Sequence, residues 1–495
     1  LKVKNATLLP DNAVLASLEK THTAPDDVFK ISFSSLSVNG IGIEDLLNKN
    51  EIDIKKIYLD HPVIEIYHTN RPYNKSEREK NDSLTLYQRL MRGMKRISID
   101  TIMLEHGTFV NHNISRKNKI TRFNDVTVKA NGLLVDSTTQ YNRDRFLFAK
   151  DADISFKDYT IPTPDSLYYF RAGSINISAA KHTLAALNIS LTPRGNREQF
   201  KKKLKQRQDL FTIKTQKFTL NEIDWYSILN EDKIIAKEGT IKGCNFSDFF
   251  DRRLPRSATT STLTNFPHQL LMRMSLPVYI EKINLENCTI KYEEFNPAAE
   301  ASGIIYFDNV NGQLSNITNM PEYIRNNNKI KLQANALFMN KVKFNIVFNL
   351  DLKNYKTGNF TVDVALGETY NSLINPIAEP LGLISVKKGI IKKVVAHIAG
   401  TDTLGTGNVL LLYDDLHLVP LKKNKDGGLK KKNITSFIAN LLLIKNSNPS
   451  KGKEQRQEDC NYKKDLNGSF FNFIWKIILT GVLKTIGIPV KLAYK

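Results

Sequence analysis

The sequence has little cysteine: its 495 residues include only Cys244, Cys288 and Cys460. Their odd number and wide spacing favour neither a disulfide framework nor a cysteine-based zinc site. The sequence also lacks any run close to the ~18 uncharged apolar residues that a membrane-spanning helix needs. Hydrophobic residues still make up 41% of the chain, so it can build a core, and wholesale disorder is excluded.

Motifs of established catalytic chemistry are missing too. There is no Gly-rich phosphate loop, no His-Glu-x-x-His, no Gly-x-Ser-x-Gly and no Cys-x-x-Cys. Dense charge clusters at Asp251–Arg253 and Glu293-Glu294 are more typical of turns or solvated faces than of acid–base sites. We therefore expect a protein that is not an enzyme and that uses no cofactor or metal.

Acidic residues are outnumbered, and the basic excess is local. Lys and Arg total 71 against 50 Asp and Glu, a net charge of +21. Residues 421–495 hold 16 basic and 5 acidic residues, and residues 194–217 hold 9 and 2. Such segments suit an anionic phospholipid surface or an acidic protein partner. A solvated helix face or tail is the alternative for each.

Nucleic acid is disfavoured as the partner. The basic run from Lys201 to Arg207 has no interleaved aromatic residues that could stack on bases. The sequence also contains no recognisable nucleic-acid-binding module.

Apolar and polar residues alternate with a period of two between residues 330 and 366. Such alternation is typical of antiparallel strands covered on one side. The breaks at Asn340-Lys341 and Lys356–Asn359 are turn-prone and predict hairpins. We predict a meander of long strands, and we take its apolar face as the candidate lipid-binding groove. The candidate residues are Val342, Phe344, Ile346, Phe348, Leu350, Leu352, Phe360, Val362, Val364 and Leu366.

An internal near-repeat, Ile-x-x-Ile-x-Leu, occurs at Ile54–Leu59, Ile99–Leu104 and Ile280–Leu285. Each copy is followed by a break and then by another alternating segment. The break carries Pro62, Gly107 or Cys288. A small residue or proline there fits a bulge or kink between two strand segments.

Pairs of Asp or Asn between apolar residues recur further along the chain. They occur at residues 124–125, 308–309 and 414–415. Their side chains can bind their own backbone, which fits short turns or bulges. Ordered recurrence of this kind is typical of elongated, repeat-like architectures.

Few helices are expected. They are Leu84–Lys95 capped by Ser83, Asn196–Gln208, Ile434–Ile444 and Ser469–Ile486. A polar linker, Lys445–Asp465, separates the last two. The fold class that we predict is mainly β: an elongated, twisted antiparallel sheet forming a groove, or a repeat-like β architecture, with a helical C-terminal tail.

The same patterns divide the chain into four segments. Residues 1–193 form a first β-rich block and residues 194–210 a basic helical connector. Residues 211–420 form a second β-rich block that contains the meander. Residues 421–495 form a basic tail with amphipathic helices.

The last expected helix has an unusual distribution of side chains. Asn472, Lys476, Thr480 and Lys484 form one narrow polar stripe. Apolar side chains cover most of the remaining circumference of this helix. This apolar arc is too wide for a helix that packs one face on a globular core, and the two lysines argue against a membrane-spanning helix. It fits either a helix in a membrane interface or one clasped between the sheet and a partner subunit. The candidate contact residues are Phe470, Phe471, Ile474, Trp475, Lys476, Ile478, Val482 and Lys484.

Several of these features together resemble a known family. The Ile-x-x-Ile-x-Leu repeats, the alternating strands, the segment Gly407–Leu416, the pair Asn448-Pro449 and the segment Phe470–Lys476 resemble AsmA-like proteins of Gram-negative envelopes, most narrowly those of Bacteroidota. The resemblance covers most of the chain, but its motifs are structural and mark no active site.

The resemblance implies a periplasmic protein anchored in the inner membrane upstream of Leu1. It also implies a long β-groove that binds or conducts phospholipid in outer-membrane biogenesis. The sequence departs from the family in its shorter length and in having no anchor at Leu1. Five tripeptides that begin at an aspartate also resemble Bacteroidota O-glycan acceptors. They start at Asp82, Asp100, Asp136, Asp165 and Asp402.

A second function stays open beside lipid binding. The chain would then be a scaffold or accessory subunit of an envelope protein assembly. An apolar strand face has the same sequence pattern whether lipid or protein covers it, so the pattern does not separate the two.

Overall fold

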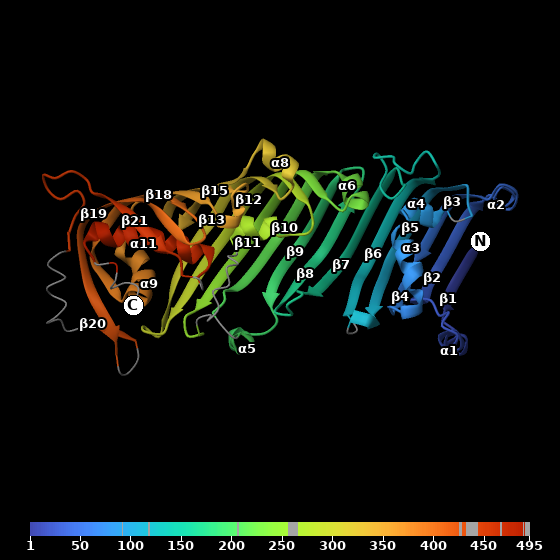
Figure 1. Ribbon diagram of the computed structural model, residues 1–495, viewed down its shortest axis with the longest axis horizontal. Helices are drawn as coiled ribbons and strands as arrows, with labels where there is room; N and C mark the ends of the chain where they lie inside the picture. The colour runs from blue at the N-terminus through green and yellow to red at the C-terminus, as the bar shows by residue number, and fades with distance from the viewer. Residues whose placement is uncertain are drawn as a thin grey trace. The chain divides into compact units, whose positions relative to one another are not determined.

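The computed structural model describes residues 1–91, 93–116, 119–204, 207–255, 266–424, 428–431, 444–465, 468–488 and 490. The chain forms two compact units. Unit 1 consists of Leu1–Thr163, Tyr169–Ile189 and Phe218–Ala236, and unit 2 of Pro164–Tyr168, Ser190–Lys217 and Lys237–Lys495. Strands dominate both units (Figure 1), which confirms the predicted mainly β fold. The four predicted segments stay a sequence-based division.

Unit 1 is a sheet with short helices (Figure 1). Strand β2 pairs antiparallel with β1, β3 and β4, and β5 to β8 pair antiparallel in sequence order, whereas β3 and β4 both run parallel to β5. Its elements are β1 (Lys2–Leu8), α1 (Asn12–Lys20), β2 (Asp27–Ile41), α2 (Ile43–Lys49), β3 (Glu51–Asp60), β4 (Val63–His68), η1 (Pro72–Asn74), α3 (Lys75–Asp82), α4 (Leu86–Leu90), β5 (Arg96–Asn113), η2 (Ile114–Arg116), β6 (Lys119–Val135), β7 (Asp151–Pro162), β8 (Tyr168–Ser178) and α6 (Trp225–Asn230). Four strands contribute residues to both units: β8, whose first residue Tyr168 belongs to unit 2, β9 (Thr183–Pro193), β10 (Leu210–Ile223) and β11 (Ile234–Asp251).

Unit 2 contains the predicted meander. Its elements are α5 (Arg197–Lys203), α7 (Pro267–Met272), β12 (Val278–Asn296), β13 (Ala301–Thr318), α8 (Pro321–Asn326), β14 (Lys329–Phe338), β15 (Val342–Asp351), η3 (Tyr355–Thr357), β16 (Phe360–Leu366), β17 (Thr369–Tyr370), α9 (Asn371–Gly382), β18 (Ile384–Gly400), β19 (Leu404–Lys423), β20 (Leu429–Lys431), β21 (Gln457–Lys463) and α11 (Phe470–Ile486).

Strands β12 to β16 pair antiparallel in sequence order, and β18 and β19 continue the series. The hairpin between β14 and β15 turns through Met339 and Asn340, whose φ angles are 49° and 60°. The break between β15 and β16 ends at Gly358, where a φ of 66° lets the chain reverse after η3. The predicted meander and both of its breaks are therefore confirmed.

The bulges predicted in the repeats are confirmed as well. The residues just before Pro62, Gly107 and Cys288 are His61, His106 and Asn287, with φ angles of 47°, 56° and 50°. The second residue of each Asp or Asn pair also has a left-handed backbone: Asp125, Asn309 and Asp415 have φ angles of 48°, 51° and 50°. Register shifts accompany these positions in β5–β6, β6–β7 and β12–β13. Asn, Asp and His are the residues, besides Gly, that adopt this left-handed backbone most readily.

Two helix predictions need correction. The helix expected over Leu84–Lys95 is only α4, because Thr85, not Ser83, forms its capping box with Gln88. The helix expected over Asn196–Gln208 is α5, capped by Asn196 but ending at Lys203.

The C-terminal segment also differs from the expectation. The predicted polar linker Lys445–Asp465 contains strand β21, which pairs with β19. The predicted helix Ile434–Ile444 lies outside the described residues except for Ile444. Helix α11 is confirmed, and the side chain of Ser469 caps it.

Candidate functional site

The ten candidate residues lie together in unit 2: nine are on β15 and β16, and Leu352 directly follows β15. The register pairs Phe344 with Leu366, Ile346 with Val364 and Phe348 with Val362, so the two strands present one common apolar face. Seven of the ten side chains are buried: Val342, Phe348, Leu350, Leu352, Phe360, Val362 and Val364. The other three, Phe344, Ile346 and Leu366, are partly buried against the same core.

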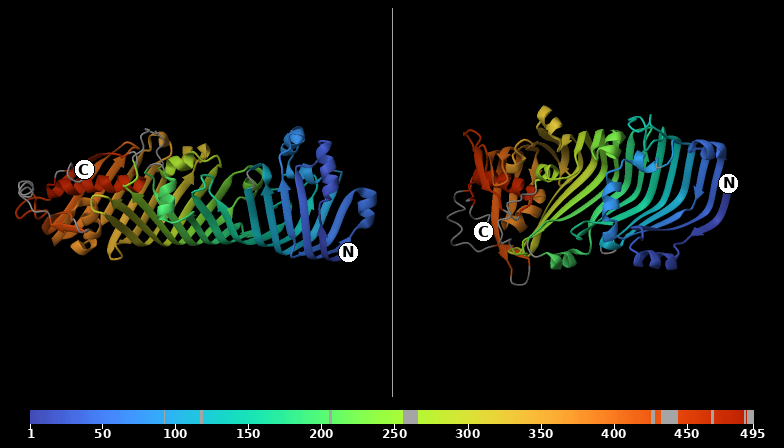
Figure 2. Two further views of the ribbon diagram at one scale, coloured as in Figure 1. Left: turned by 90° about the horizontal axis from the view of Figure 1, so that it is seen from below. Right: turned by 45° about the vertical axis from the view of Figure 1, so that its right-hand side comes forward.

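Helix α11 lies across this face in unit 2 (Figure 2). The Phe470 ring centroid is 5.8 Å from that of Phe348 and 5.3 Å from that of Phe360. Phe473, Ile474 and further residues of α11 belong to the same core. In this structure the predicted lipid-facing strands are therefore covered by the chain's own C-terminal helix.

The polar positions of α11 do not share one environment. Asn472 and Thr480 are 2% and 1% exposed, whereas Lys484 is exposed and Lys476 is half-buried. The predicted polar stripe is therefore not uniformly exposed to solvent, because Asn472 and Thr480 face protein. Of the eight candidate contact residues, Phe470 and Ile474 are buried, Phe471 and Lys484 are exposed, and Trp475, Lys476, Ile478 and Val482 are intermediate.

Asn472 anchors the first turn of α11 to a buried polar cluster. Its Nδ2 atom donates to the Tyr292 hydroxyl at 2.8 Å and to Glu294 Oε2 at 3.0 Å. The Tyr292 hydroxyl also donates to Glu294 Oε2 at 2.9 Å. Asp248 is only 1% exposed; its burial and the neighbouring Asp209 raise its pKa to about 9. The cluster thus includes a carboxyl group that stays protonated at neutral pH.

The pair Glu293-Glu294 corrects a sequence interpretation, because neither side chain is solvated. Glu293 is 6% exposed and Glu294 is 2% exposed. Burial alone would raise the pKa of Glu293. Hydrogen bonds from Arg197, at 2.8 and 2.9 Å, and from Lys291 outweigh burial and hold the pKa at about 2. The sequence could not reveal this pairing, because Arg197 lies far away along the chain.

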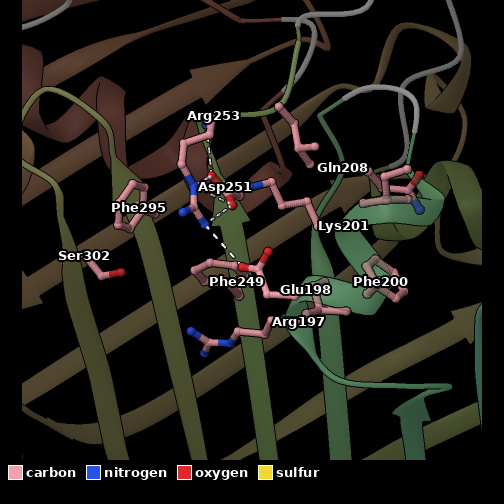
Figure 3. A pocket seen from close by; sticks show the side chains of 13 residues that line it. Arg197, Glu198, Phe200, Lys201, Gln208, Phe249, Asp251, Arg253, Phe295 and Ser302 are labelled. Atoms are coloured by element: carbon pink, nitrogen blue, oxygen red, sulfur yellow. Dashed lines mark hydrogen bonds and ion pairs between the residues drawn. The ribbon is translucent and has the colours of Figure 1, made fainter.

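A small pocket of about 190 Å³ lies beside α5 in unit 2. Arg197 and Arg253 place their guanidinium carbons 4.0 Å and 4.2 Å from the ring centroids of Phe249 and Phe295. Figure 3 shows Arg253 bonded to Asp251, as expected for the predicted turn at Asp251–Arg253. Because carboxylates pair with both arginines, the net charge of the pocket is small, and we assign no ligand to it.

Unit 1 presents apolar side chains in continuous rows. The repeat Ile54–Leu59 pairs in parallel with the repeat Ile99–Leu104, so equivalent residues become neighbours. One row across β2, β3, β5 and β6 is Leu36, Leu59, Leu104 and Val128, and the next is Val38, Ile57, Ile102 and Ala130. The two rows share a face, since their members lie two residues apart on each strand.

These two rows are less covered than the candidate face of unit 2. Of the eight side chains, only Ala130 is buried, and the other seven keep intermediate exposure. Leu352, Val362 and Val409 in unit 2, by contrast, are at most 1% exposed. Apolar faces that stay partly open to solvent mark interaction sites in soluble proteins. Sequence reasoning found the repeats but did not identify this face.

Comparison with known proteins assigns no family: no protein-family model and no curated protein matches the chain. Within the described residues, no helix combines the length and apolarity needed to span a membrane. The described His, Cys, Asp and Glu side chains form no group of three suited to holding a metal ion.

Proposed function

We propose that this protein is a non-enzymatic, membrane-anchored periplasmic protein of the AsmA-like type. It binds or conducts phospholipid along the apolar face of its sheet in outer-membrane biogenesis. The observation that carries the proposal is the pair of apolar rows across β2, β3, β5 and β6, which keep intermediate exposure. Acyl chains laid on such rows would remove that apolar surface from water, at roughly 25 cal/mol per Å².

The basic segments support the same proposal. Lys201, Lys202 and Lys203 form the last turn of α5. Their positive charges suit anionic lipid head groups. The rows of unit 1 supply apolar surface and α5 of unit 2 supplies positive charge, and these two kinds of group suit the acyl chains and the head groups of phospholipids.

A scaffold function is the second candidate. In unit 2 the equivalent apolar face is covered by protein, namely α11. A partner segment of similar character could cover the rows of unit 1 in the same way. The chain would then hold an envelope assembly together without carrying lipid.

Native mass spectrometry and lipid extraction on the purified protein separate the two functions. We expect phospholipid to co-purify with the wild type, and we expect the double variant Ile57→Asn and Ile102→Asn to lose most of it. The matched control is Lys56→Asn, at an exposed position of the same strand, which should keep its lipid. Far-UV circular dichroism verifies that all three proteins fold. Equal lipid content in the wild type and the double variant would contradict lipid binding on these rows.

Localisation is tested separately. The proposal places the native product in the periplasm, held to the inner membrane by a segment upstream of Leu1. Fractionation of the full-length product should recover it with the inner membrane. Recovery in the cytoplasmic fraction would contradict both candidate functions.

A further inference from the structure

Two of the three cysteines meet on neighbouring strands of unit 2. Cys244 lies on β11 and Cys288 on β12, and these strands are adjacent in the sheet. Cys288 Sγ approaches the Ile241 carbonyl oxygen of β11 at 3.9 Å. The Cys244 side chain packs against the small core that contains Cys288. The scattered sequence positions gave no sign of this pair.

A residue with a left-handed backbone precedes each of the two cysteines. Gly243, with a φ of 63°, immediately precedes Cys244, and Asn287, with a φ of 50°, immediately precedes Cys288. A left-handed residue in a strand resets which face the next side chain takes. Val310, which follows the left-handed Asn309, is likewise buried, with an exposure of 4%. Both thiols therefore occupy the same position of the repeated bulge and share one small core with Val310, Ala334 and Ala336.

The two thiols differ in access and in proton affinity. Hydrogen bonds from Cys288 and then Thr215 stabilise the Cys244 thiolate and lower its pKa to about 6, although burial opposes this. The hydrogen bond to Cys244 and then burial raise the pKa of Cys288 above its usual range. Cys244 is also the more exposed of the two. This is the arrangement of a nucleophilic thiolate beside a second thiol that can resolve a mixed disulfide.

We propose that Cys244 and Cys288 form a reversible disulfide bond that ties β11 to β12 under oxidising conditions. The oxidant is a disulfide compound, such as glutathione disulfide or the disulfide form of a protein thiol oxidase. The Cys244 thiolate attacks one oxidant sulfur, forms a mixed disulfide and releases one thiol. Cys288 then loses its proton and attacks Cys244 Sγ, which releases the second thiol. Two electrons pass to the oxidant, and the two cysteine protons end on its two thiols.

Cys460 is not part of this reaction. It lies on β21, is 3% exposed and belongs to the core beneath α11. Burial raises the pKa of its thiol. It therefore serves as an internal control in the same molecule.

Peptide mapping of the whole protein tests the proposal. The purified protein is equilibrated with glutathione mixtures of increasing disulfide content, alkylated with N-ethylmaleimide and digested with trypsin without reduction. Trypsin releases Cys244 in peptide 243–252, Cys288 in peptide 283–291 and Cys460 in peptide 457–463. We expect the first two peptides to appear linked, at their summed mass less two hydrogen atoms, while the third stays alkylated.

Matched variants make the result specific. Cys460→Ser should form the same linked peptide at the same glutathione ratio as the wild type. Cys244→Ser should leave Cys288 alkylated at every ratio. If the wild type and Cys460→Ser both keep Cys244 and Cys288 alkylated in the most oxidising mixture, or carry glutathione on Cys244 without linkage, the proposal is overturned. The test involves no lipid, so its outcome is independent of the proposed function.

Discussion

Gly481 of α11 lies directly against Val409 of β19, and a methyl group at Gly481 would come within 2.5 Å of Val409 Cγ2. Gly405 of β19 has the same relation to Ile477 of α11, at 2.1 Å. The helix therefore approaches the sheet closely at two places where one of the two contacting residues is glycine. Because of these contacts, even a change of glycine to alanine should disturb the packing of α11 on the sheet.

Replacing Gly481 with alanine should loosen α11. The added methyl group overlaps Val409, and overpacking of this kind lowers the free energy of unfolding by about 1–3 kcal/mol. Urea denaturation followed by the fluorescence of the two tryptophans, Trp225 and Trp475, measures the change. Gly382→Ala is the control, because nothing lies within 4 Å of a methyl group there. A stability loss equal in both variants would show that the close approach is not the cause.

A charge on the apolar face of β15 should be strongly destabilising. Ile346 packs against the core beneath α11, and Ile346→Asp would place a carboxylate there without a partner. We expect a loss of roughly 3–5 kcal/mol in the free energy of unfolding. Asn345→Asp, at an exposed position of the same strand, should change stability little. Wild-type stability of Ile346→Asp would refute the assigned face.

The buried carboxyl of Asp248 should make the fold less stable as pH rises. Its folded pKa, about 9, exceeds the ordinary value of 3.8, so the folded chain holds a proton that the unfolded chain has lost. This cost grows as pH rises above about 4 and is complete near pH 9. Asp248→Asn, which resembles the protonated form, should therefore be more stable than the wild type at pH 8 by roughly 1–3 kcal/mol.

The advantage of Asp248→Asn should shrink as pH falls below about 4, where Asp248 is protonated in the folded and in the unfolded wild type. Thermal unfolding of both proteins at several pH values measures this difference in stability. Asp153→Asn, at an exposed position of β7, provides the comparison. If both variants follow the pH profile of the wild type, Asp248 does not hold its proton in the folded chain.

Asn448 should be difficult to replace. It is 1% exposed, and its amide donates to the Leu411 and Arg456 carbonyl oxygens at 2.6 and 2.8 Å and accepts from the Arg456 nitrogen at 2.7 Å. Asn448→Ala leaves these buried backbone groups unpaired, which should lower the free energy of unfolding by about 2–5 kcal/mol. Chemical denaturation beside the exposed Asn461→Ala measures the difference. Equal midpoints would show that water replaces the amide at no cost.

The features that could be predicted from the sequence depend on near neighbours in the chain. The alternation around Phe348, the helix starts at Asn196 and Ser469 and the bulges at Asp125 and Asn309 are local patterns with a fixed period or spacing. They are confirmed because backbone geometry alone produces them.

What could not be predicted depends on distant partners. The burial of Glu293 requires Arg197, the meeting of the cysteines requires two separate strands, and the cover over β15 requires α11. The width of the apolar arc on α11 indicated that the helix is enclosed, but a pattern of apolar residues does not say what encloses it.

The cover that α11 provides has a consequence during protein synthesis. Strands β15 and β16 leave the ribosome about a hundred residues before the helix that shields them. At about 5–20 residues per second, their apolar face stays without its cover for roughly 5–20 s. For that interval the nascent chain resembles one that ends before α11. Any factor that keeps the chain from aggregating must act on the meander before translation reaches the last helix.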